Sequence, residues 1–79
     1  MEIEIRVFAT LRKYLTIPHQ QGTIRMQAEE NSKVKDLIEK LELPPQEITV
    51  IMVNGVRGEE EQVLKEGDRL ALFPPVGGG

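Results

Sequence analysis

The chain has 79 residues, which allows one domain with one modest core. Its formal net charge of −3 argues against nucleic acid as a partner, because phosphates favour a clustered basic face. The sequence has no cysteine, which excludes disulfides, thiolate metal sites and thiol nucleophiles, and it has no membrane span or signal peptide pattern, so we expect a cytoplasmic protein without membrane contact.

Residues 2–8 alternate apolar and charged side chains, which predicts a half-buried strand with one apolar face formed by Ile3, Ile5 and Val7. By parity Phe8 falls on the opposite, charged face. Thr10 is expected to N-cap a short helix over residues 11–15, which Pro18 ends. Tyr14 is predicted to pack beneath this helix.

A second strand is predicted over residues 23–28, with Ile24, Met26 and Ala28 facing inward. The next segment has the apolar stripe of an amphipathic helix at Val34, Leu37, Ile38 and Leu41. We expect Asn31 or Ser32 to cap this helix and Pro44-Pro45 to stop it.

Residues 48–53 are mostly β-branched and precede Asn54-Gly55, which predicts a hairpin with a brief return strand over residues 56–57. Residues 64–68 predict a tight turn around Gly67. The final predicted strand, residues 69–73, places Leu70 and Leu72 inward, and Arg69, Ala71 and Phe73 outward. Pro74-Pro75 ends it, because proline cannot donate to a strand ladder.

This order of elements predicts an α+β fold, a ubiquitin-like β-grasp in which a mixed sheet packs against one main helix, with a short extra helix after the first strand. We expect residues 1–73 to form the domain and residues 74–79 to form a flexible C-terminal tail.

The tail is Pro74-Pro75-Val76-Gly77-Gly78-Gly79. Glycine is the poorest residue for ordering a chain, so stability does not explain three of them in a row. A thread without Cβ atoms can instead enter a channel that excludes side chains, and extended it would reach on the order of 20 Å.

The sequence resembles the MoaD-like sulfur carriers, the small subunits of molybdopterin synthase. The resemblance rests on residues 8–12 (FATLR), Val53-Asn54-Gly55, residues 65–68 (KEGD) and, above all, residues 72–76 (LFPPV) followed by Gly78-Gly79. It implies that a MoeB-like adenylyltransferase activates Gly79, that a persulfide donor supplies sulfur, and that a MoaE-like large subunit receives the resulting thiocarboxylate. ATP with Mg would belong to the activating partner, because this chain has no nucleotide-binding glycine loop and is expected to bind no cofactor itself.

Other functions remain open on the sequence alone. The chain could carry sulfur for tungsten-pterin or thiamin synthesis, it could modify proteins through Gly79, or it could be a plain β-grasp binding module. The first two begin with the same acyl-adenylate, so the tail does not separate them.

The predicted docking surface consists of Phe8, Ala71 and Phe73. In a β-grasp sheet the first and last strands are neighbours, so the two outward rings should meet, and interfaces favour such aromatic anchors. The alternative is that a sheet edge curls over the rings.

The remaining polar residues suggest no catalytic group or metal site. His19 is expected to be solvated in a loop, and Asp36 and Glu39 are expected to pair with Lys33, Lys35 and Lys40 along the helix. The acidic runs, residues 29–30 and 59–61, are interpreted as solvated loops, or alternatively as a docking patch for a basic partner.

Overall fold

A computed structural model of the chain describes residues 1–75. The predicted tail residues Val76, Gly77, Gly78 and Gly79 lie outside the described residues. The elements in chain order are β1 (Glu2–Val7), the 3-10 helix η1 (Ala9–Tyr14), β2 (Thr23–Gln27), α1 (Val34–Lys40), the 3-10 helix η2 (Pro45–Glu47), β3 (Val50–Val53), β4 (Val56–Arg57) and β5 (Arg69–Phe73).

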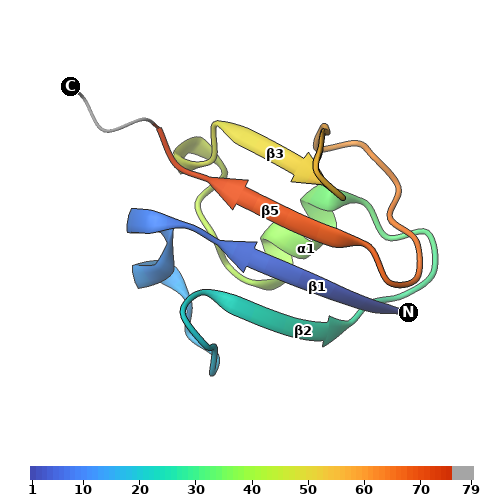
Figure 1. Cartoon of the computed structure of the whole chain (residues 1–79), viewed down its shortest axis with the longest axis horizontal. Coiled ribbons are helices and arrows are strands. Elements are labelled where there is room, and N and C mark those ends of the chain that lie inside the picture. The colour runs from blue at the N-terminus through green and yellow to red at the C-terminus, as the bar shows by residue number, and fades with distance from the viewer. Residues whose placement is uncertain (76–79) are drawn as a thin grey trace.

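The five strands form one mixed sheet in the order β2-β1-β5-β3-β4. The first and last strands lie side by side at its centre, where β1 runs parallel to β5, and the other neighbours are antiparallel. Figure 1 shows α1 packed across one side of the sheet, with the opposite side uncovered. The predicted α+β fold with a mixed sheet and one main helix is therefore confirmed.

The core lies between the sheet and α1. The inward residues of β1 and β5 are at most 1% exposed, and the helix stripe is at most 4% exposed. These buried residues are Ile3, Ile5, Val7, Leu70 and Leu72 from the strands, and Val34, Leu37, Ile38 and Leu41 from the helix segment. Period-2 and helical spacing thus identified the core-facing side chains correctly.

The short helix differs from its prediction in type and limits. It is a 3-10 helix that begins at Ala9, and Phe8, not Thr10, is its N-cap residue, without a side-chain cap. The Leu11 N–H donates to the Phe8 carbonyl at 3.1 Å, and the Leu11 side chain is fully buried. The buried Leu11 side chain anchors this six-residue helix on the core. Tyr14 packs partly buried against the core, as predicted.

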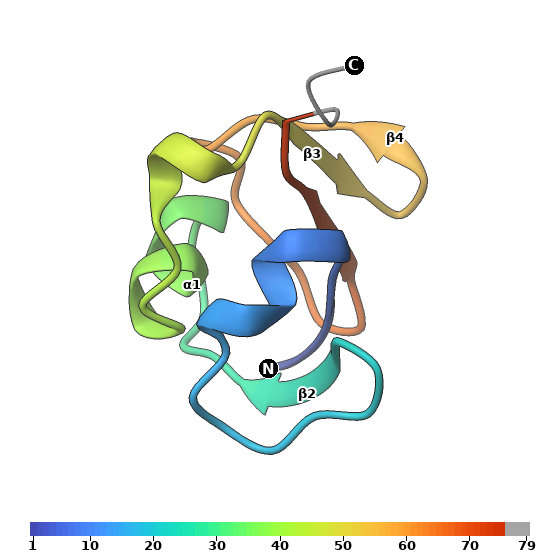
Figure 2. The same cartoon turned by 90° about the vertical axis from the view of Figure 1, so that its left-hand side faces the viewer.

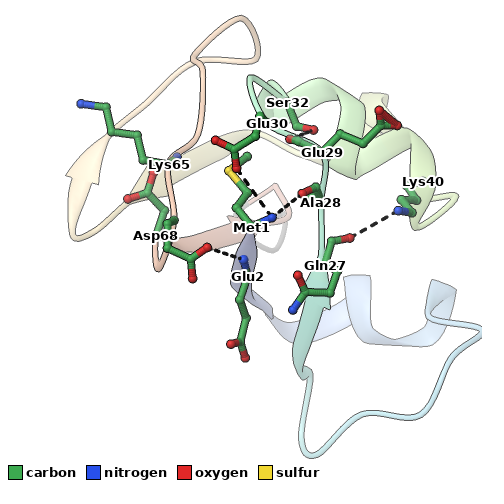
Figure 3. A network of polar contacts seen from close by, with 11 residues as sticks. Met1, Glu2, Gln27, Ala28, Glu29, Glu30, Ser32, Lys40, Lys65 and Asp68 are labelled. Atoms are coloured by element: carbon green, nitrogen blue, oxygen red, sulfur yellow. Dashed lines mark hydrogen bonds and ion pairs between the residues drawn. The ribbon is translucent and has the colours of Figure 1, made fainter.

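Both ends of α1 also differ from the prediction. The cap residue is Lys33, not Asn31 or Ser32, and its N–H donates to the Asp36 carboxylate at 2.8 Å. The Ser32 hydroxyl instead donates to the Glu29 carbonyl (Figure 3). The helix ends at Lys40, before the Pro44-Pro45 pair that was expected to stop it.

The chain reverses after α1 at Glu42, which has a φ of 57°, in the left-handed region that favours glycine. Pro45 then starts η2, so β3 begins at Val50, not at residue 48 as predicted. Ile48 still packs partly buried against the core. The proline pair therefore shapes the connection into β3 and does not end the helix.

The predicted hairpin turn is confirmed, with φ of 52° at Asn54 and 81° at Gly55. The Asn54 side-chain NH₂ group donates to the Asp68 carboxylate at 2.8 Å. The Asn54 side-chain oxygen Oδ1 accepts the Arg69 N–H at 2.9 Å. Gly67, in the predicted turn before β5, also has a positive φ of 81°. Asn54 thereby ties the hairpin turn to the start of β5.

Polar contacts join the start of β1 to the elements beside it (Figure 3). The Met1 nitrogen donates to the Ala28 carbonyl at 2.7 Å and lies 3.8 Å from the Glu30 carboxylate. The Lys40 ammonium donates to the Gln27 carbonyl at 3.4 Å, which links the end of α1 to the end of β2. Within residues 1–75, no helix has the length and apolar composition needed to cross a membrane.

Candidate partner-binding surface

Phe8 and Phe73 come together where β1 and β5 end. The Phe8 N–H donates to the Leu72 carbonyl at 3.1 Å, so the main chains stay joined beyond the last residue of β1. The two rings stack with centroids 4.4 Å apart and planes 8° apart. The prediction that strand parity would bring these rings together is confirmed.

Neither phenylalanine belongs to the core. Side chains alternate along a strand, so Phe73 points away from the face on which Leu72 is buried, and Phe8 stacks on it there. Each phenylalanine is half-buried, so no sheet edge covers the pair completely. An apolar groove of about 430 Å³ runs beside the rings, and its lining residues are Phe8, Ala9, Val50, Met52, Phe73, Pro74 and Pro75. The rings thus form one wall of an open apolar groove.

Ala71, the third predicted docking residue, lies in the row next to the rings. It pairs with Arg6 on β1 and with Met52 on β3. Val50 is paired in the same way with Phe73. We use the term outer face for the five residues Phe8, Val50, Met52, Ala71 and Phe73.

The sequence analysis missed Val50 and Met52, although the signal was present. Ile51 and Val53 are buried, so the alternation along β3 turns Val50 and Met52 outward. The segment is apolar on both sides, and such a run looks like a strand buried on both faces. Only the pairing with β5 shows that half of it borders the phenylalanine pair.

Arginines surround the apolar outer face. The Arg6 guanidinium lies 3.3 Å from the Glu4 carboxylate. The Arg25 guanidinium lies 3.5 Å from the Glu4 carboxylate and 3.7 Å from the Glu2 carboxylate. Arg57 and Arg69, both exposed, make no ion pair among residues 1–75. Surface ion pairs contribute only about 0–1 kcal/mol each, so these arginines add little to the stability of the fold.

Strand β5 carries the chain directly from the outer face to the tail. Pro74 is half-buried and Pro75 is exposed, and both line the groove beside the rings. Because proline fixes φ, the two residues restrict the backbone where β5 ends. The described part of the predicted tail therefore adjoins the predicted docking residues.

His19 is exposed, and its Nδ1 accepts the Gly22 N–H at 2.9 Å. Gly22 has a φ of 84°, and a Cβ there would collide with the Val7 carbonyl. His19 thus supports a turn that only glycine can form. No group of three or more potential metal-ligating side chains occurs within residues 1–75.

The prediction that Asp36 and Glu39 pair with lysines along α1 is wrong. Lys33 and Lys35 instead bind Glu61, with N–O distances of 3.0 and 2.8 Å. The hydrogen bond from Lys35, together with that from Lys33, lowers the pKa of the Glu61 carboxyl below its ordinary value, and the same contact with Glu61 raises the pKa of Lys35. Part of the acidic run over residues 59–61 therefore pairs within the chain.

A mixed β-grasp sheet packed on one helix defines the class of ubiquitin-like proteins. Within this class, the family model described as Mut7-C ubiquitin matches residues 1–77, and the chain belongs to that family. No curated protein sequence is significantly similar to the chain.

Solved structures extend this result. SAMP1 (small archaeal modifier protein 1) from Haloferax volcanii shares 25% identity, with a TM-score of 0.74 over 100% of both chains. The HVO 2177 protein of the same organism shares 26%, with a TM-score of 0.75 over 100% of this chain and 87% of that one. In the complex of subunits 1 and 2 of the molybdopterin-converting factor from Helicobacter pylori, the matching chain shares 23%, with a TM-score of 0.64 over 100% of both chains.

The resemblance to MoaD-like proteins inferred from the sequence is confirmed, and the fold is the ubiquitin-like β-grasp. The neighbours include both a modifier and a subunit of a molybdopterin-converting factor. Fold alone therefore does not separate these two uses.

Proposed function

We propose that this chain is a sulfur carrier that acts as the small subunit of a molybdopterin synthase, with Gly79 as its reactive C-terminal residue. The observation that supports the proposal is the continuity of the outer face with the start of the tail. Phe73, Pro74 and Pro75 share one groove, so a partner that covers this groove also receives the tail. The Helicobacter pylori neighbour is itself found in complex with subunit 2 of its converting factor.

The activation step is acyl transfer. A free carboxylate resists nucleophiles, because it is charged and has no usable leaving group. In the proposal, the Gly79 carboxylate attacks the α-phosphate of ATP on a MoeB-like partner, pyrophosphate leaves, and an acyl-adenylate forms. The terminal sulfur of a donor persulfide then displaces AMP, and a thiol cleaves the resulting acyl disulfide to give the thiocarboxylate and a disulfide.

The transfer step depends on position. The thiocarboxylate sulfur attacks an electrophilic pterin precursor held by a MoaE-like partner, and hydrolysis returns Gly79 to a carboxylate. The outer face supplies the binding energy, while Pro74, Pro75 and Val76 direct the thin Gly77, Gly78 and Gly79 thread into the partner's site. Holding reactants together in this way replaces a bimolecular encounter by an intramolecular one. In this proposal the chemistry takes place in the cytoplasm, where ATP is available, and no group of this chain acts as an acid, base or metal ligand.

The test is the intact mass of the chain after incubation with the activating enzyme from the same organism, ATP, Mg²⁺ and a persulfide donor. We expect a gain equal to sulfur minus oxygen on the full chain, and no gain on a variant lacking Gly78 and Gly79. Adenylate formation can be followed separately by ATP–pyrophosphate exchange. The proposal fails if the shortened variant gains the same mass, or if the full chain gains none while a control carrier does.

A second candidate is a protein modifier joined to target lysines through Gly79. It is favoured by the 25% identity to SAMP1 over the whole of both chains. In the same reaction supplemented with cell extract, attachment to other proteins would appear as a ladder on a gel. A ladder without the sulfur mass gain would replace the carrier proposal by the modifier. Supply of sulfur to thiamin synthesis would give the mass gain but would not restore sulfur transfer to the pterin with a MoaE-like subunit. A tungsten-pterin carrier would pass both assays, because the metal enters after sulfur transfer, and the metal content of the finished cofactor separates it from the molybdenum pathway.

A further inference from the structure

A second groove lies on the helix side of the sheet, away from the outer face. It has a volume of about 440 Å³ and runs between the end of η1, the helix α1 and the segment that leads into η2. Figure 2 shows these three elements grouped on the same side of the sheet. None of its lining residues belongs to the outer face, so the two surfaces are separate.

Apolar side chains form the floor and walls of this groove. Ile38 and Leu43, each 3% exposed, belong to the core, and Tyr14 and Pro44 are half-buried beside them. Small-molecule sites usually add a few convergent polar groups that fix the ligand's orientation. Within residues 1–75 no polar side chain is buried, so this groove suits an apolar side chain presented by a larger partner.

Carboxylates surround the rim of the groove. Glu39, Glu42 and Glu60 line it and are all exposed. Among residues 1–75, Lys35 is the one cation that lines it, and its ammonium already binds the Glu61 carboxylate at 2.8 Å. The three rim carboxylates make no ion pair among residues 1–75, so they favour the approach of a positively charged partner.

The backbone at the rim is held in place. The Glu42 N–H donates to the Glu39 carbonyl at 2.9 Å, and the Leu43 N–H donates to the Ile38 carbonyl at 3.1 Å. These bonds fix the left-handed turn at Glu42 that separates the helix from the prolines. The groove is therefore largely preformed, and little ordering is needed before a partner binds.

We propose that this groove binds a peptide segment of a partner protein, in which one bulky apolar side chain is flanked by lysine or arginine. The apolar side chain occupies the space over Ile38 and Leu43, and the flanking cations face the rim carboxylates. Binding there leaves the outer face open, so the chain can hold two proteins at once. This inference does not depend on the proposed sulfur chemistry.

The test is an NMR titration of the ¹⁵N-labelled chain with a short synthetic peptide that has a central Leu-Phe pair between two Lys-Arg pairs. We expect saturable shifts at the amides of Tyr14, Ile38 and Leu43, and little change at Phe8 and Met52. The control peptide carries glutamate in place of each lysine and arginine and should cause no saturable shift. Raising the salt concentration should weaken binding of the basic peptide, because rim charges are screened.

Two pairs of substitutions test whether the peptide binds in this groove or is attracted to the acidic protein as a whole. Glu39→Gln with Glu42→Gln should weaken binding about fivefold, as expected for the loss of two exposed ion pairs. Glu29→Gln with Glu30→Gln removes the same charge elsewhere and should leave the affinity unchanged.

Three results would overturn the proposal: equal weakening by both pairs of substitutions, saturable binding of the acidic peptide, or shifts confined to the outer face. Analytical ultracentrifugation of the chain alone tests whether a second copy of this chain, instead of a partner peptide, occupies the groove. Salt-sensitive self-association that shifts the same three amides would assign the groove to dimerisation instead.

Discussion

The two faces of the sheet are built from the same strands and serve different purposes. On β5, Leu70 and Leu72 are at most 1% exposed against the helix side, while Ala71 and Phe73 alternate with them and remain half-exposed. On β1, Val7 is buried and the adjacent Phe8 stacks on Phe73. One strand thus contributes both to stability and to the candidate interface, and substitutions one position apart should separate the two.

The largest expected effect is on stability and comes from the inner face. Leu72→Ala should lower the free energy of unfolding by about 2–5 kcal/mol, because it leaves a cavity in the core. Phe73→Ala should cost only about 1 kcal/mol, mainly the ring stack. Urea denaturation of the two variants measures both values. Equal losses would mean that Phe73 is a core residue and that the contrast between the faces is wrong.

An intermediate effect is expected on partner affinity and comes from the outer face. Phe8→Ala should weaken binding to the cognate activating enzyme about 30-fold, or about 2 kcal/mol, as for an aromatic interface anchor. Isothermal titration calorimetry measures this change. Ile17→Ala is the matched control, because Ile17 is 39% exposed and lines neither groove. If the two variants bind alike, the outer face is not the docking surface for that enzyme.

The smallest effect concerns the charges on the helix side. Replacing Lys35 and Lys33 by Gln should raise the pKa of the Glu61 carboxyl back toward its ordinary value, which carboxyl NMR titration can follow. Because folding lowers this pKa, the contribution of Glu61 to stability is present above its unfolded-state pKa and is lost as the pH falls through the folded value. The difference in stability between the chain and the variant should therefore shrink in acid. A constant difference would show that the lysines act through packing instead.

Local patterns predicted the features that depend on neighbouring residues in the chain. Alternation along residues 2–8 and 69–73 identified the buried side chains, and the Asn54-Gly55 pair identified the hairpin. Strand parity, combined with the β-grasp order, also placed Phe8 beside Phe73. These inferences succeeded because side-chain direction along a strand follows from its pleat alone.

Features that depend on distant residues were missed. Glu61 binds lysines 26 and 28 positions away, so nothing in the helix sequence indicated that Lys33 and Lys35 would pair outside the helix. The end of α1 depends on the left-handed turn at Glu42. Glycine usually occupies such a turn, so a glutamate at this position did not indicate it. The groove beside α1 was likewise invisible, since its walls come from three separate segments.

The parallel pairing of β1 with β5 at the centre of the sheet also has a mechanical consequence. A pull applied between Met1 and Pro75 acts along both strands in opposite directions and loads the hydrogen bonds of their ladder together, in shear. Strand β5 is also held by β3 on its other side, so tension on the end of the chain is shared by two ladders. A partner that grips and draws the tail would therefore meet a firmly anchored base, and the domain should stay folded while the thread is pulled taut.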